Sequence, residues 1–134
     1  MNRKGSLLAG ALLGGVGVMT GAFGAHALQA TLEASGKTET FELAVRYQLF
    51  HALALLAVGL LMKQHSSRLE WASTLMLAGT VCFSGSLYII SLSELRGGLV
   101  FITPLGGTLL IAGWAMLAMG ILRDLKANSD AENG

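Results

Sequence analysis

The chain has 134 residues, of which 53 % are hydrophobic and only 13 % are charged, with a formal net charge of +1 at pH 7. Soluble domains carry about 25 % charged residues, and nucleic-acid-binding domains carry a concentrated positive charge, so the composition argues against both classes. The single cysteine, Cys82, excludes an internal disulfide bond and is expected to be a small buried apolar residue.

Four long segments that contain no Asp, Glu, Lys or Arg dominate the chain, at residues 5–32, 47–62, 71–93 and 97–122. A bilayer core about 30 Å thick requires roughly 20 helical residues, and the second segment reaches that length if its helix starts near Phe41. We therefore predict an all-α, polytopic membrane protein whose four transmembrane helices form an antiparallel bundle. The predicted helices are approximately 6–28, 41–62, 70–92 and 99–122. They form one domain, residues 1–125, followed by a polar cytoplasmic tail, residues 126–134, which we expect to be frayed.

The first segment resembles a secretory signal, because Arg3 and Lys4 precede an apolar run and residues 25–27 form an A-x-A-like cleavage site. Its apolar stretch is nevertheless longer than the usual 7–15-residue core of a signal. Five glycines follow each other at spacings of 4, 3, 4 and 3, which places them on one side of a helix, where another backbone can approach. This glycine seam consists of Gly10, Gly14, Gly17, Gly21 and Gly24. We expect a retained, helix-packing span, although apolar membrane segments are also glycine-rich without such a role.

The distribution of basic residues predicts the orientation in the membrane. Six lie on one side of the four spans: Arg3, Lys4, Lys63, Arg68, Arg123 and Lys126. Three lie on the other side: Lys37, Arg46 and Arg96. Because Lys and Arg are enriched in cytoplasmic loops, both termini are predicted to be cytoplasmic, with residues 29–40 forming the longest external loop.

All four predicted spans place polar or helix-distorting residues in their outer halves. These residues are His26, Arg46, Tyr47, Gln48, His51, Ser84, Ser86, Tyr88, Thr103, Pro104, Gly106 and Gly107. The inner halves, such as residues 54–61 and 109–119, are almost entirely apolar or small. Ionisable residues within spans usually face the bundle interior and mark a functional site, so this set is our candidate ligand-binding site.

Structural explanations for the same residues stay open. Arg46 and His51 can anchor a helix end at the headgroups, with Arg46 snorkelling outward or pairing with Glu42 one turn earlier. Membrane serines commonly hydrogen-bond to carbonyls of their own helix. Pro104 can simply open a helix, or the proline and the glycine pair after it can leave backbone groups free for a ligand.

Metal, cofactor and catalytic interpretations have little support. His26 and His51 could act as axial haem ligands, but the sequence has no C-x-x-C-H motif and no acidic ligand cluster. Nucleotide-binding and hydrolase motifs are absent from the sequence as well. Glu42 and His51 could serve as acid and base, but they are nine residues apart and face different directions on one helix. We expect no metal, no cofactor and no enzymatic activity.

Several motifs resemble those of a known family: GAFGAHAL at 21–28, RYQLFHALALL at 46–56, FSGSLY at 83–88, and ITPLGG at 102–107, followed by GW at 113–114. Over about residues 7–122 the chain is similar to the YgdD/YwdK-like proteins, small four-span membrane proteins of unknown function. The resemblance implies a bacterial cytoplasmic (inner) membrane location and retention of the first helix. It implies no reaction.

Two functions are therefore expected. The first is a binding or permeation module for a small ligand, anion or lipid headgroup, with Arg46, His51, Tyr88 and residues 103–104 lining the site. The alternative is a non-catalytic accessory or assembly subunit, in which the glycine seam packs against a partner protein. The expected partners are the lipid bilayer and a second copy or another membrane protein, with no role for nucleic acid.

Overall fold

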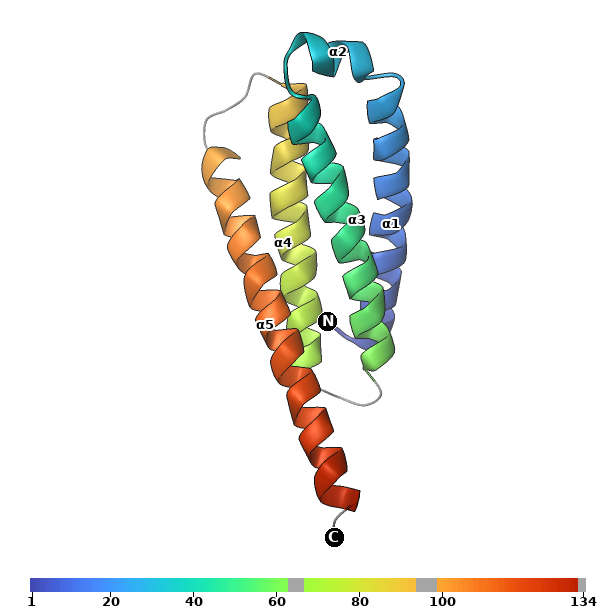
Figure 1. Ribbon diagram of the computed structural model, residues 1–134, viewed down its shortest axis with the longest axis vertical. Helices are drawn as coiled ribbons and strands as arrows, with labels where there is room; N and C mark the ends of the chain where they lie inside the picture. Colours follow the sequence, from blue (N-terminus) through green and yellow to red (C-terminus); the bar gives the residue numbers. More distant parts are fainter. Residues whose placement is uncertain (63–66, 94–98, 133–134) are drawn as a thin grey trace.

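The computed structural model describes residues 1–62, 67–93 and 99–132, and every regular element in these ranges is an α-helix. The helices are α1 (Arg3–Ala25), α2 (Gln29–Ala34), α3 (Thr38–Leu61), α4 (Ser67–Leu92) and α5 (Leu99–Glu132). Helices α1, α3, α4 and the Phe101–Ala127 part of α5 are long and apolar enough to cross a membrane. The all-α fold with four candidate spans is thus confirmed, and Figure 1 shows their antiparallel course.

The first helix ends earlier than predicted. The backbone leaves the helical region at His26, so α1 stops at Ala25 rather than near residue 28. Part of the expected loop, residues 29–40, instead forms the six-residue helix α2, and α3 already begins at Thr38. Gly36 joins α2 to α3 with φ 64°, a left-handed conformation that glycine adopts without a steric penalty. The chain therefore crosses from α1 to α3 through a short helix at the end of the bundle (Figure 1).

The polar C-terminal segment is helical rather than frayed. Helix α5 continues through Glu132 and extends beyond the other helices (Figure 1). Between Arg123 and Glu132 the sequence contains neither glycine nor proline, so nothing local interrupts the helical hydrogen bonds. The end of the predicted tail, residues 133–134, lies outside the described residues.

The long helices pack in the order of the chain: α1 against α3, α3 against α4, and α4 against α5. Figure 1 shows them side by side in this order, with α2 at one end of the bundle and Met1 toward the other. We call these the α2 end and the Met1 end. Helices α1 and α5 each have one main neighbour, so much of their apolar surface is exposed, as Leu12 and Ile111 illustrate.

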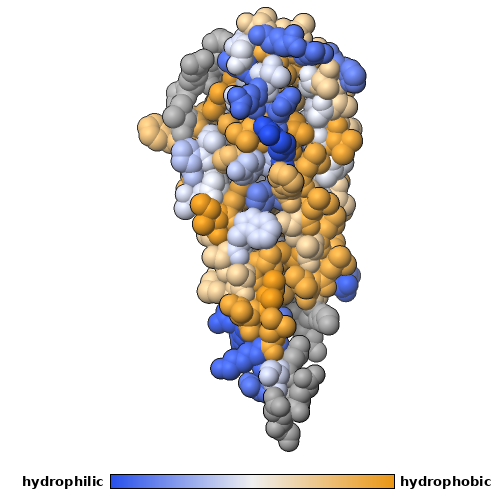
Figure 2. Space-filling model, viewed as in Figure 1, coloured by the Kyte–Doolittle hydropathy of each residue, from blue (hydrophilic) through white to orange (hydrophobic). Residues whose placement is uncertain are grey.

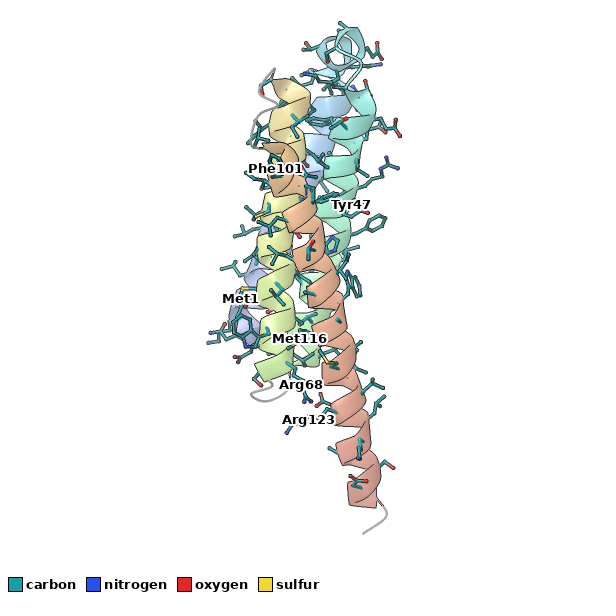
Figure 3. All side chains as sticks on the ribbon, turned by 90° about the vertical axis from the view of Figure 1, so that its left-hand side faces the viewer. Met1, Tyr47, Arg68, Phe101, Met116 and Arg123 are labelled. Carbon is teal, nitrogen blue, oxygen red and sulfur yellow. The ribbon has the colours of Figure 1, made fainter. Side chains whose placement is uncertain are left out.

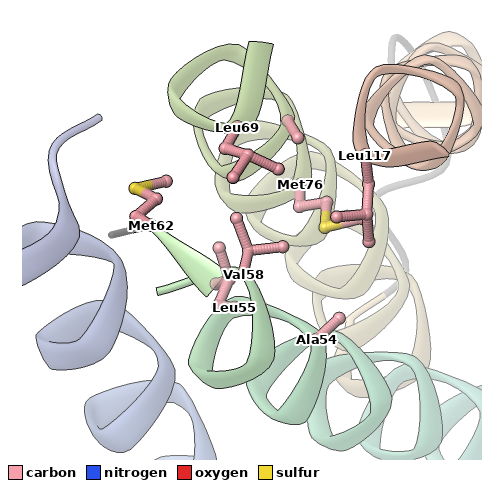
Figure 4. Packing of buried hydrophobic residues seen from close by; sticks show 8 residues of the cluster. Ala54, Leu55, Val58, Met62, Leu69, Met76 and Leu117 are labelled. Carbon is pink, nitrogen blue, oxygen red and sulfur yellow. The ribbon is translucent and has the colours of Figure 1, made fainter. Parts of the chain in front are cut away.

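A cluster of buried apolar side chains fills the half of the bundle nearer the Met1 end (Figure 4). Its members are Ala54, Leu55, Val58, Met62, Leu69, Ala72, Met76 and Leu117. They come from α3 and the residue after it, from α4 and from α5. In a membrane, such helices are held together chiefly by van der Waals packing, so this close fit stabilises the arrangement.

Small residues set the distance between neighbouring helices. The five residues of the glycine seam face α3; a methyl group on Gly10, for example, would lie 2.8 Å from the carbonyl oxygen of Ala52. A second set lies between α4 and α5, where a methyl group on Gly106 would lie 2.5 Å from the backbone nitrogen of Phe83. Gly113 and Gly120 follow Gly106 at intervals of seven residues; Gly113 approaches the backbone of α4 at Met76, and Gly120 approaches the side chain of Leu69. Close backbone approach therefore holds both outer helices.

Candidate ligand site at the α2 end

The predicted polar set separates into distinct groups, the first of which joins α1, α3 and α4. The buried side chain of Gln48 donates from Nε2 to the carbonyl oxygen of Leu13 over 2.9 Å and accepts from the Tyr88 hydroxyl over 2.8 Å. The Thr20 hydroxyl lies 3.2 Å from that of Tyr88. The two polar atoms of Gln48 are thus hydrogen-bonded within the protein, which makes this group an interhelical connection rather than a binding surface.

The second group surrounds His51, which is buried on α3. The indole Nε1 of Trp114 donates to His51 Nε2 over 3.2 Å, and His51 Nδ1 lies 2.8 Å from the carbonyl oxygen of Tyr47. Because an indole can only donate, Nε2 is the acceptor and Nδ1 carries the proton. Both ring nitrogens are therefore occupied by protein groups. His26, the other histidine considered for a metal or haem, is exposed at the end of α1.

Tyr47 belongs to the same group but reaches the surface. Its ring centroid lies 5.9 Å from that of His51 and 4.4 Å from that of Phe83, and 37 % of the residue is exposed. Figure 3 shows the side chain projecting outward from α3. Tyr47 thus covers His51 on one side, and the aromatic contacts join α3 to α4.

The third group joins α4 and α5. The hydroxyls of Ser86 and Thr103 lie 2.6 Å apart, so one donates to the other, and each oxygen also lies within hydrogen-bonding distance of a carbonyl oxygen of its own helix. Pro104 lies inside α5, not at its start, and its side chain is exposed. Gly106 is buried against α4, while Gly107 lies beside the Phe83 ring. Ser84 is 2 % exposed, and its hydroxyl has no hydrogen-bond partner among the described residues.

A cavity of about 460 Å³ lies between the ends of α1 and α3 and is covered by α2. Its lining residues are Gly21, Gly24 and Ala25 from α1, Gln29, Leu32 and Glu33 from α2, and Thr38, Phe41, Glu42, Val45 and Arg46 from α3. Of the predicted ligand residues, only Arg46 lines it. His51, Tyr88 and residues 103–104, which were expected beside Arg46, lie outside its lining. The side chains of His51, Tyr88 and Thr103 form the interhelical groups above, and that of Pro104 is exposed on α5.

Three ionisable side chains line this cavity: Glu33, Glu42 and Arg46, and all three residues are exposed. Gln29 donates from Nε2 to the Glu33 carboxylate over 2.9 Å. Within the described ranges, neither Glu42 nor Arg46 makes a hydrogen bond or an ion pair, so of the two alternatives for Arg46 the pair with Glu42 is not formed. The guanidinium of Arg46 and the carboxylate of Glu42 are consequently available to a ligand, and the Glu33 carboxylate, which accepts one hydrogen bond, can accept others. Figure 2 shows hydrophilic side chains extending from the α2 end down one face toward the apolar belt.

The α2 residues were absent from the prediction because residues 29–40 were interpreted as a loop. A helix of six residues is too short to show the repeated apolar spacing by which an amphipathic helix is recognised in a sequence. Lys37 was also overlooked as a structural residue. It is buried, and its ammonium group donates to the carbonyl oxygen of Ser93 at the end of α4 over 2.9 Å. A cation at a helix C-terminus stabilises the unsatisfied carbonyls there.

The accessory-subunit interpretation expected the glycine seam to face a partner protein. In the structure the seam faces α3 of the same chain: Gly17 and Gly24 approach the side chains of Leu49 and Phe41. The seam is therefore an internal packing surface and gives that interpretation no support.

Comparison with known proteins identifies relatives over most of the chain. Residues 20–107 match the family described as "Protein of unknown function (DUF423)". A UPF0382 membrane protein of Staphylococcus saprophyticus is 43 % identical over 117 residues, covering 87 % of this chain and 96 % of the relative. The UPF0382 inner membrane protein YgdD of Escherichia coli strain K12 is 40 % identical over 124 residues, covering 92 % and 93 %. No solved structure matches the chain.

The family match spans more than half of the chain, and these relatives are membrane proteins by name. Their names agree with the four helices that are long and apolar enough to cross a membrane. The resemblance inferred from the sequence motifs is thus confirmed, and the chain belongs to the DUF423 family of membrane proteins of unknown function.

Proposed function

We propose that this protein binds a small amphiphilic ligand, or a lipid, in the cavity beneath α2. The observation that carries this proposal is the cavity itself, which is about 460 Å³ in volume and has Arg46 in its lining. Ligand sites are typically concave, about 300–1,000 Å³ in volume, and mostly apolar with a few polar groups that orient the ligand. Leu32, Phe41 and Val45 supply the apolar wall, and Arg46 and Glu42 supply the polar groups.

Binding is favoured over permeation by the rest of the bundle. Toward the Met1 end, buried side chains such as Leu55, Val58 and Met76 fill the space where α3, α4 and α5 meet. Gln48 and Tyr88 hydrogen-bond to each other rather than lining a polar path. Catalysis is also disfavoured, because both ring nitrogens of His51 are occupied within the protein. A binding role requires neither a polar path through the bundle nor a free catalytic group, but only the cavity.

We propose further that the α2 end faces away from the cytoplasm and that the protein lies in the bacterial cytoplasmic membrane. Five of the described Lys and Arg residues belong to the Met1 end or to the extension of α5: Arg3, Lys4, Arg68, Arg123 and Lys126. Figure 3 shows Arg68 and Arg123 at this end. Only Lys37 and Arg46 of the described Lys and Arg residues belong to the α2 end, and by the positive-inside rule this distribution supports a cytoplasmic Met1 end. Lys63 and Arg96, which the sequence-based count included, lie outside the described residues.

Blocking the cavity tests the proposed binding site. Ala25 lines the cavity, whereas Ala22, which is also exposed and lies about one turn earlier on α1, does not. We expect Ala25→Phe to abolish retention of a bound small molecule or lipid when the protein is released from nanodiscs into a native mass spectrometer. The matched substitution Ala22→Phe should leave retention unchanged. Identical retention by both variants and the native protein would refute a site in this cavity.

A further inference from the structure

The charges around the cavity define a class of ligand. We infer that the cavity holds a zwitterionic phospholipid headgroup, with the phosphate on Arg46 and a primary ammonium group on the carboxylates of Glu42 and Glu33. The inference rests on the proposed function and adds the identity of the occupant. Its basis is charge complementarity between the lining of the cavity and a headgroup that carries both signs.

Arg46 and Glu42 can contact neighbouring parts of one ligand. They are four residues apart on α3, so their Cβ atoms are about 5–6 Å apart on one face of the helix. Glu33 faces the same cavity from α2. A guanidinium group matches phosphate oxygens with two parallel hydrogen bonds, and a carboxylate accepts hydrogen bonds from an ammonium group. Both groups of a zwitterion therefore find a partner of opposite charge.

The balance of charge disfavours headgroups of a single sign. Two carboxylates and one guanidinium give the three ionisable lining residues a net charge of −1 when all are ionised. A purely anionic headgroup would bring its phosphate near Glu42 as well as Arg46, whereas a purely cationic ligand would leave Arg46 without a partner. A quaternary ammonium has the required charge but no N–H to donate. A primary ammonium next to a phosphate satisfies all three residues.

The position of the cavity suits a lipid rather than a soluble molecule. Arg46 lies eight residues after Thr38, or about 12 Å along α3, so its backbone lies within the span and its long side chain can extend toward the headgroups. Gly21, Gly24 and Val45 form the part of the wall between the two spans, and none of them carries a polar side chain. A headgroup held by Arg46 could place the adjoining glycerol and acyl carbons against these residues. We therefore assign the site to a phospholipid of the surrounding leaflet.

Titrating the full-length protein in detergent with defined lipids tests the inference. Phosphatidylethanolamine, phosphatidylglycerol and phosphatidylcholine with identical acyl chains are compared by native mass spectrometry. We expect phosphatidylethanolamine to bind about tenfold more tightly than the other two, as one charge-assisted hydrogen-bonded group would give. Glu42→Gln should reduce this preference to about twofold or less, and Arg46→Gln should weaken the binding of all three lipids. The control, Glu39→Gln, removes an exposed carboxylate of α3 outside the cavity and should change nothing.

The outcomes separate the two proposals. If Ala25→Phe abolishes lipid binding but native protein binds phosphatidylglycerol or phosphatidylcholine as tightly as phosphatidylethanolamine, the cavity is a binding site and the zwitterion inference is wrong. If Ala25→Phe changes nothing, the cavity is not the site and both proposals fail. Finally, binding of glycerophosphoethanolamine, a water-soluble compound with the same headgroup and no acyl chains, is measured in the same way. Binding as tight as that of phosphatidylethanolamine would overturn the assignment to a lipid.

Discussion

Trp114 on α5 donates its indole N–H to Nε2 of His51 on α3 over 3.2 Å, which links two helices that both pack against α4. The ring centroids lie 6.2 Å apart with an edge-on orientation, and half of the tryptophan surface is exposed. The indole therefore extends over α4 to reach α3. This hydrogen bond therefore restrains α5 relative to α3 directly, in addition to the packing of both helices on α4.

Removal of this hydrogen bond should lower the stability of the bundle while leaving it folded. Trp114→Phe keeps an aromatic ring but leaves His51 Nε2 without its donor. We expect the free energy of unfolding to fall by about 1 kcal/mol, since hydrogen bonds between membrane helices contribute roughly 0.6–1.7 kcal/mol. The measurement is unfolding by sodium dodecyl sulfate in mixed micelles. Trp71→Phe, at an exposed tryptophan of α4, is the matched control. Equal stability of the two variants would show that the hydrogen bond contributes nothing.

The Gln48–Tyr88 hydrogen bond should appear as an energetic coupling between α3 and α4. Gln48→Leu and Tyr88→Phe each remove one side of the 2.8 Å contact, so the double variant cannot lose that contact twice. We predict a coupling energy of about 0.6–1.7 kcal/mol in a double-mutant cycle of unfolding free energies. Leu13, whose carbonyl receives the second hydrogen bond from Gln48, is unchanged throughout. Strict additivity of the two substitutions would contradict the interhelical role assigned to this pair.

Two adjacent glycines of α5 should respond very differently to alanine. A methyl group on Gly106 would lie 2.5 Å from the backbone nitrogen of Phe83, whereas the nearest atom to one on Gly107 is 3.8 Å away. Gly106→Ala must separate α4 from α5 and should cost about 1–3 kcal/mol of stability. Gly107→Ala should be neutral or stabilise the helix, by up to about 1 kcal/mol. Thermal unfolding in detergent compares the two, and similar melting temperatures would argue against the close approach.

Much of the fold could be predicted because it depends on local properties. A charge-free segment of about 20 residues in lipid must satisfy its backbone hydrogen bonds internally, so each such segment forms a helix wherever its neighbours lie. The spacing of Gly10, Gly14, Gly17, Gly21 and Gly24 likewise placed these residues on one face of a single helix. Which of the predicted site residues lie side by side could not be predicted in the same way. Depth in the membrane placed twelve residues at one level, but depth does not determine which face of a helix meets which neighbour.

The sequence by itself determined the spans, their alternating direction, the glycine seam and the family, because these depend on composition and on spacing along one helix. The tertiary structure alone decided which side chains of different helices contact each other. His51 and Trp114 are separated by 63 positions, and their hydrogen bond exists only because both helices pack on α4. Similarly, Arg46 faces a cavity because α2 folds across the ends of α1 and α3. Contacts between distant segments depend on how helices are rotated and spaced, and the packing of all four helices together sets that geometry.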